Sequence, residues 1–176
     1  MAKRIASLAT FTPTAQADGV LTTQTFLAMG GGAATDYMSI SDIIQSGQAN
    51  ASAFNAMTLA RSSALGITPT ALALPNTDGF NRAASTAYGT NPIVYWAAAT
   101  APNRSPAVTL ARLQLGFNAF GGTLRTAFAP GNEWQSLGAA GSALGVASQS
   151  ENVFSCSNAA GTTSGAQSIS VTYELL

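Results

Sequence analysis

The amino-acid sequence predicts an all-β chain, folded as an antiparallel β-sandwich of jelly-roll-like type with about eight strands. Three observations lead to this fold class. Apolar and polar residues alternate with a period of two in the clearest segments, as in strands with one buried face. Glycine and proline interrupt the chain at short intervals, and no segment carries a convincing long helical pattern. The length, 176 residues, is that of a single domain.

The C-terminal segment gives the most regular strand. Ile169, Val171, Tyr173 and Leu175 alternate there with serine, threonine and glutamate residues. Because successive side chains of a strand point to opposite faces of its sheet, the apolar set shares one face. We therefore expect a half-buried strand over residues 168–175.

A β-hairpin is predicted over residues 112–128. Apolar residues alternate with polar ones over 113–119, and an apolar return segment follows at 124–128 before Pro130. Between them stands Gly121-Gly122, a pair suited to the positive φ angles of a tight turn. The pattern indicates two neighbouring antiparallel strands.

Other strands are less regular. The segments with partial alternation or a short β-branched run are 20–29, 37–45, 93–96, 133–137 and 143–147. Residues 50–65 fit helical spacing and period two about equally well. Their threonine and serine residues favour a strand there, and a helix stays open as the alternative.

Two segments are expected to lie outside the regular part of the fold. Residues 1–18 are polar and threonine-rich, so we expect an extended N-terminal arm followed by a single β-sandwich domain at 19–176. Residues 66–92 show little periodicity and contain three prolines, which predicts a long loop with at most one helical turn at 82–88. Loops of that length usually carry a function or lie in a contact.

The composition excludes several classes of function. Seven basic and seven acidic residues cancel, and charged residues are 8% of the chain against about 25% in an ordinary soluble domain. No field is therefore expected to attract nucleic acid or an anionic membrane. The chain has no histidine and one cysteine, Cys156, which excludes histidine-based triads, zinc sites built on His or several Cys, and intrachain disulfides. No apolar stretch has signal-peptide or membrane-spanning length, so we expect synthesis in a cytoplasm without a cleaved signal.

The basic residues are almost all arginine. Lys3 is the single lysine, against six arginines. Lysine is depleted and arginine enriched where surface is buried against a partner, and zero net charge leaves self-association unopposed. A GC-rich genome would produce the same bias, and that explanation stays open beside the first.

Candidate catalytic groups are few, and the sequence selects none of them. A serine–lysine dyad would need Lys3 to be buried, and a glycosidase would need two carboxylates in one cleft. For each carboxylate a turn or a solvated strand edge is the simpler interpretation. The carboxylates considered are Asp18, Asp36, Asp42, Asp78, Glu133 and Glu151. We predict that the protein is not an enzyme and has no catalytic, cofactor-binding or metal site.

Three further features also have simpler interpretations. Gly30-Gly31-Gly32 lacks the lysine and following helix of a phosphate loop. Asn76-Thr77-Asp78-Gly79 has oxygen ligands but lacks the distal glutamate of a calcium loop. Trp96 and Trp134 could stack on a sugar, although core or subunit contacts are commoner for such side chains.

Several segments resemble small proteins encoded among the virion genes of tailed bacteriophages. They are 14–24, 40–49, 59–63 and 103–105 leading into 113–137, the last with Phe-Asn-Ala-Phe-Gly-Gly and Ala-Pro-Gly-Asn-Glu-Trp. The similarity extends over most of residues 3–176 and is one of segments, not of a diagnostic motif. The proteins to compare are capsid decoration or cement proteins, which are β-rich and present in many copies. The resemblance implies a structural role and brings no catalytic residues.

Composition and resemblance together predict a protein that works through its contacts. We expect it on the exterior of the virion head, bound to the major capsid protein and stabilising the shell, as a homo-oligomer and preferably a trimer. Neither nucleic acid nor a membrane is an expected partner. The alternative is a carbohydrate- or receptor-binding β-sandwich module. The candidate contact residues are Lys3, Arg4, Phe11, Arg61, Arg104 and Arg112.

Overall fold

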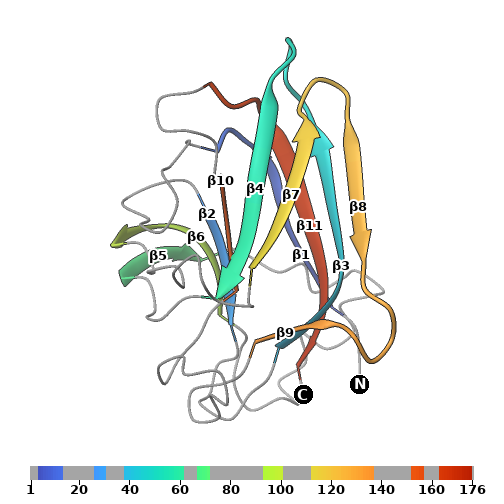
Figure 1. The fold of residues 1–176 in the computed structure, drawn as a ribbon. Coiled ribbons are helices and arrows are strands. Elements are labelled where there is room, and N and C mark those ends of the chain that lie inside the picture. Colours follow the sequence, from blue (N-terminus) through green and yellow to red (C-terminus); the bar gives the residue numbers. More distant parts are fainter. Residues whose placement is uncertain are drawn as a thin grey trace.

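The described part of the chain consists of strands and the turns between them, without a helix. The computed structural model describes residues 4–13, 26–30, 38–61, 67–71, 93–100, 112–136, 152–156 and 163–175. Its strands are β1 (Arg4–Phe11), β2 (Phe26–Gly30), β3 (Met38–Gly47), β4 (Phe54–Arg61), β5 (Ile67–Ala71), β6 (Ile93–Thr100), β7 (Arg112–Asn118), β8 (Thr123–Ala127), β9 (Trp134–Ser136), β10 (Asn152–Cys156) and β11 (Gln167–Leu175), drawn in Figure 1. Every pairing between them is antiparallel. The prediction of an all-β, antiparallel chain is confirmed for these residues.

The strands form two sheets. Sheet A has the order β1-β11-β3-β8, and the short β9 pairs with the first part of β3. Sheet B has the order β5-β6-β2-β10-β4-β7. Among the described strands, β7 ends sheet B and β8 ends sheet A, although the two are consecutive in the chain.

One hydrophobic core takes its side chains from both sheets. Sheet A contributes Leu8, Phe11, Met38, Ile40, Ile43, Ile169, Val171 and Tyr173, and sheet B contributes Leu27, Met29, Met57, Leu59, Leu115 and Phe154. The predicted C-terminal strand is confirmed as β11, where Ile169, Val171 and Tyr173 are fully buried and the polar residues that alternate with them are half-buried. Burial of each large apolar side chain stabilises the fold by about 1.5–3 kcal/mol.

The predicted hairpin around Gly121-Gly122 is wrong in its pairing. Both strands and the turn are present, with Gly121 at a φ of 69°. However, β7 pairs with β4 in sheet B, whereas β8 pairs with β3 in sheet A. The connection is therefore a β-arch, a link between strands of different sheets. Alternation could not reveal this, because in a hairpin and in an arch the apolar side of both strands faces the same core.

The prediction of an N-terminal arm is corrected for residues 4–11. They form β1, which pairs with β11 of the same chain and places Leu8 and Phe11 in the core. The pattern of this strand is obscured because Thr10 precedes further threonines at 12 and 14, and because a register shift between Leu8 and Phe11 interrupts its buried positions. Residues 1–3 and 14–18 of the predicted arm lie outside the described residues.

The prediction of a loop over 66–92 is likewise corrected at its start, where β5 pairs with β6 despite Pro69. Proline is tolerated there because β5 is at the end of its sheet and the register shifts at this residue. Residues 72–92, with the expected helical turn at 82–88, lie outside the described part.

The remaining strand predictions are confirmed where they can be seen. The ambiguous segment 50–65 contains β4, a strand, and the segment 133–137 contains β9. The segments at 37–45 and 93–96 fall on β3 and β6, which continue to Gly47 and Thr100. The segment at 20–29 contributes the first residues of β2. The expected strand at 143–147 is not among the described residues.

Candidate functional site

Two β-arches lie side by side at one end of the molecule, at the top of Figure 1. Residues 48–53 link β3 to β4, and residues 119–122 link β7 to β8, each crossing between the sheets. The backbone N–H of Gly47 donates to Gly122 O (2.8 Å), that of Ala49 to Ala119 O (3.0 Å), and that of Ala119 to Ala53 O (2.7 Å). These bonds join the arches. We call residues 47–54, 117–122 and 163–166 the arch end.

The third segment of the arch end is held by a buried side chain. Asn55 has no exposed surface, and its Nδ2 donates to Gly165 O (2.9 Å) while its Oδ1 accepts from the Gly165 N–H (2.8 Å). The backbone N–H of Gln48 also donates to Ala166 O (2.8 Å). Sheet A and sheet B are thereby tied together immediately before β11 begins.

Several glycines of the arch end are required because other atoms approach them so closely, and Gly47 and Gly165 are two of them. A Cβ on Gly47 would lie 2.1 Å from Ala119 O, a backbone atom of the other arch. A Cβ on Gly165 would lie 2.6 Å from Ala119 Cβ and 2.8 Å from Ala49 Cβ. Only hydrogen fits at either site, so the small residues of these segments are a condition of the packing.

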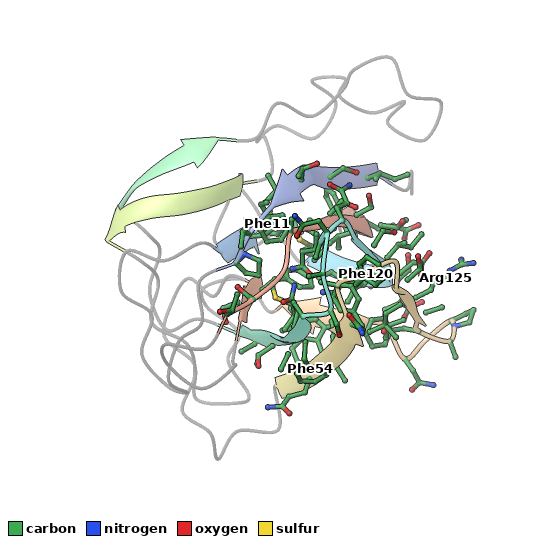
Figure 2. All side chains as sticks on the ribbon, turned by 90° about the horizontal axis from the view of Figure 1, so that it is seen from above. Phe11, Phe54, Phe120 and Arg125 are labelled. Atoms are coloured by element: carbon green, nitrogen blue, oxygen red, sulfur yellow. The ribbon has the colours of Figure 1, made fainter. Side chains whose placement is uncertain are left out.

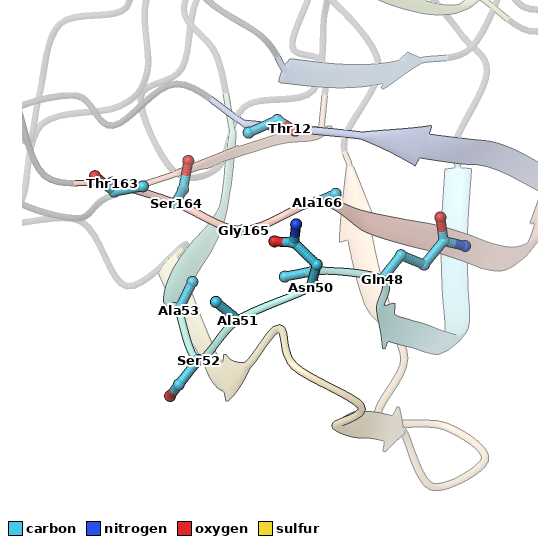
Figure 3. A pocket seen from close by; sticks show the side chains of 11 residues that line it. Thr12, Gln48, Asn50, Ala51, Ser52, Ala53, Thr163, Ser164, Gly165 and Ala166 are labelled. Carbon is cyan, nitrogen blue, oxygen red and sulfur yellow. The ribbon is translucent and has the colours of Figure 1, made fainter.

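A depression of about 490 Å³ opens at the arch end, as Figure 3 shows. It lies between the 48–53 arch, the 163–166 segment and the residue that follows β1. Its lining combines small apolar residues with neutral polar ones and contains no charged or aromatic residue. The lining residues are Thr12, Gln48, Ala49, Asn50, Ala51, Ser52, Ala53, Thr163, Ser164, Gly165 and Ala166.

Two aromatic side chains are exposed at the same end, Phe54 by 61% and Phe120 by 56%. Figure 2 shows the molecule from above, and the labelled Phe54 and Phe120 lie away from Phe11 in it. Phe11 precedes Thr12, which lines the depression. Phe54 lies over Gly116, where a Cβ would come within 2.9 Å of its ring. The backbone N–H of Phe120 donates to Asn118 Oδ1 (2.9 Å), and Asn118 Nδ2 donates to Ser52 Oγ (3.1 Å).

Charged residues are absent from the arch end. Those in the described part are Arg4, Asp42, Arg61, Arg112, Arg125, Glu133 and Glu174. None of the 18 residues at 47–54, 117–122 and 163–166 is charged, whereas ordinary domains carry charge on about a quarter of their residues. An uncharged surface with exposed aromatic side chains has the composition of an interface core.

The charged residue of β8, the strand that follows the 119–122 arch, is paired with an opposite charge. Arg125, on β8, contacts Asp42 of β3 through Nε at 3.1 Å from each carboxylate oxygen and through Nη2 at 3.0 Å. The hydrogen bonds and charge of Asp42 raise the pKa of Arg125. Arg125 itself is 66% exposed, so this pair contributes to the surface rather than to the core.

The structure separates the predicted contact residues from this surface. Arg4, Arg61 and Arg112 lie at the ends of their strands that are away from the arches. Arg61 and Arg112 are on neighbouring strands, where Arg112 pairs with Ala60, the residue before Arg61. Phe11 is 5% exposed and packs in the core, so little of its ring is accessible, and its role in a contact stays a prediction. Lys3 and Arg104 lie outside the described residues.

The candidate chemical groups form no cluster where they can be seen. Asp42 is held by Arg125, and Glu133 accepts the Gly131 N–H at 3.0 and 2.9 Å, a turn contact. Within the described ranges no three His, Cys, Asp or Glu side chains come together as a metal site would require. Asp18, Asp36, Asp78, Glu151 and the loop 76–79 lie outside those ranges, as do Gly31 and Gly32.

Trp134 is half-buried and packs against the core, and the side chain of Trp96 is outside the description. The residues that the structure describes include no helix long and apolar enough to cross a membrane.

Sequence reasoning missed Phe54, Phe120 and Asn55, although a signal for each existed. With 113, 115, 117 and 119 facing the core, the period of two puts Phe120 outside. The same phase on β4, where 55, 57 and 59 are buried, puts Phe54 outside and Asn55 inside. Comparison with protein-family models, with curated proteins and with solved structures gave no match.

Proposed function

We propose that this chain is a non-enzymatic virion structural protein of tailed bacteriophages, a capsid decoration or cement protein. In this proposal the two sheets form a jelly-roll-like β-sandwich. The protein binds the major capsid protein on the exterior of the head, as a homo-oligomer and preferably a trimer, and stabilises the shell. Its partners include neither nucleic acid nor a membrane.

The observation that carries the proposal is the uncharged arch end with its two exposed phenylalanines. Removing charged groups from water against another protein costs several kcal/mol per unpaired ion, so surfaces that become buried avoid them. Exposed aromatic side chains on a backbone that is fixed by hydrogen bonds give contact area at little cost in conformational entropy. A lattice repeats each such contact many times, so modest interfaces suffice.

The proposal moves the expected contact surface from the N-terminal arm to the arch end. Residues 4–11 already serve as a strand of their own sheet, so they are not available as a separate arm. Arg4, Arg61 and Arg112 stay candidates for a second contact at the opposite end, together with Lys3 and Arg104.

Co-sedimentation with phage heads tests the function. Heads prepared without this protein are mixed with the purified chain, and bound copies are counted by quantitative gel densitometry. We expect saturable binding at a fixed number of copies per head and a higher temperature of DNA release. If the heads sediment without bound chain even when the purified chain is present in large molar excess, the proposal is refuted.

A carbohydrate-binding module is the second candidate, favoured by the depression. Its neutral amide and hydroxyl side chains, among them Gln48, Asn50 and Ser164, are the groups that hydrogen-bond sugars. The lining has no aromatic residue on which a sugar ring could stack. A glycan array distinguishes the two: specific, millimolar or tighter binding abolished by Asn50→Ala supports the module, and an array without a hit leaves the structural role.

A further inference from the structure

The arch end carries a projecting side chain and a depression on different sides. Phe120 stands in the link between β7 and β8, the strands that end the two sheets on that side. The depression lies toward β1, which ends sheet A on the other side, and Thr12 next to β1 forms part of its wall. Both features therefore belong to the arch end: Phe120 stands in the 119–122 link (Figure 2), and the depression lies among the 48–53 link, the 163–166 segment and Thr12 (Figure 3).

Phe120 has a firm support. Ala119, which precedes it, is fully buried and has both backbone groups bonded to the other arch, at Ala53 O and Ala49 N. The N–H of Phe120 is itself bonded to Asn118. A ring held outward on a fixed backbone loses little freedom when it becomes buried, which is the property of an interface anchor.

The depression suits an aromatic ring from another molecule. Ala49, Ala51, Ala53, Gly165 and Ala166 supply small apolar surface, and hydroxyl and amide groups form the remainder. The segments that line it are fixed by the Asn55–Gly165 and Gln48–Ala166 hydrogen bonds. None of the described residues of the arch end is charged, so contact between the depression and Phe120 desolvates no ion of these segments.

We propose that Phe120 of one copy of this chain seats in the depression of a second copy. Because the two features differ, the contact is heterologous, and a heterologous contact forms a ring when its rotation closes and an open filament when it does not. The inference takes the closed form. The inference rests on the proposed function in taking the chain as a self-associating structural protein, and it names the surface through which the copies associate. A trimeric ring is the expected product.

Two other contacts between copies of the chain fit the structure less well. Phe54 packs over Gly116 of its own sheet and so is already engaged. Pairing of β8 with β8 of a second copy would bring Arg125, at the middle of each strand, close to its equivalent, and a charged edge strand opposes such pairing.

The test mixes two variants that each lack one half of the contact. Phe120→Ser removes the ring, and Ala51→Trp fills the depression. Both positions are exposed, so circular dichroism and the unfolding midpoint should match the wild type. Light scattering should give the wild type a multiple of the 17.7 kDa chain mass and each variant alone 17.7 kDa. An equimolar mixture keeps one intact contact and should give dimers of twice the chain mass.

Ile44→Ser is the matched control, because Ile44 is an exposed apolar residue (37%) on sheet A outside the arch end, and it should assemble like the wild type. If Ala51→Trp changes the circular dichroism, Ala51→Glu replaces it. A monomeric wild type, a fully assembled Phe120→Ser, or a mixture without dimers would overturn the inference. If the chain forms rings but does not bind heads, the proposed function is wrong and this inference stands. If the wild type is monomeric and binds heads, this inference is wrong and the proposed function stands.

Discussion

Asn55 illustrates how single polar residues decide the geometry of the arch end. It is a buried amide whose donor and acceptor both bind the backbone of Gly165, which closes the segment before β11. Gln45 and Gln167 are also fully buried nearby on β3 and β11, and their amide atoms have no hydrogen-bond partner among the described residues. Buried polar groups with complete partners fix one arrangement, and those without partners reduce stability.

Replacing Asn55 with alanine should therefore cost much more than replacing an exposed asparagine of the same arches. Asn55→Ala leaves the Gly165 N–H and C=O buried and unbonded, and we expect a loss of roughly 2–4 kcal/mol in the free energy of unfolding. Asn118→Ala removes bonds at an exposed site, so its loss should stay below about 1 kcal/mol. Chemical denaturation measures both. Equal losses would show that the Asn55 amide does not hold the 163–166 segment.

At the scale of elements, periodicity predicted the strands well and their partners poorly. The positions of β3, β4, β7, β8 and β11 follow from alternation, because a buried face requires it. The arches do not follow, since pairing across sheets depends on long-range packing that a local pattern does not contain. β1 could not be predicted for a related reason: the polar residues in and after it, among them Thr10 and Thr12, resemble an arm until its pairing with β11 is known.

The close approach of the two arches predicts a strong effect at Gly47. Gly47→Ala would place a methyl group on the backbone of Ala119, so we expect a loss of about 1–3 kcal/mol or more in unfolding free energy. Gly121 has open space around it, and Gly121→Asn, which tolerates its positive φ, should be nearly neutral. Thermal unfolding of the two variants gives the comparison. If Gly47→Ala unfolds at the wild-type midpoint, the arches do not approach as described.

Deleting residues 1–11 should destabilise the fold as a whole. The deletion removes Leu8 and Phe11 from the core, a loss of about 3–6 kcal/mol, and exposes the edge of β11. That is a large fraction of the stability of a typical domain. Calorimetry of the truncated chain measures the effect. A separate arm would leave the midpoint unchanged, and that result would contradict the assignment of β1 to sheet A.

At the scale of the whole molecule, the described charged residues lie along the strands or beyond their ends, and the arch end has none. Composition predicted a surface meant to be covered but could not place it, because the segments at 47–54, 117–122 and 163–166 meet only in the folded chain. Arg4, Arg61 and Arg112, chosen from the sequence, lie at the opposite end, and the exposed phenylalanines mark the end that we propose to be covered.

The molar mass of the purified, unmodified chain in solution tests this account most directly. Light scattering over a range of protein concentrations should give a closed oligomer, with a mass that is a whole multiple of 17.7 kDa and does not grow further. A chain that keeps the mass of a single copy at every concentration would contradict the claim that neighbouring copies cover the arch end.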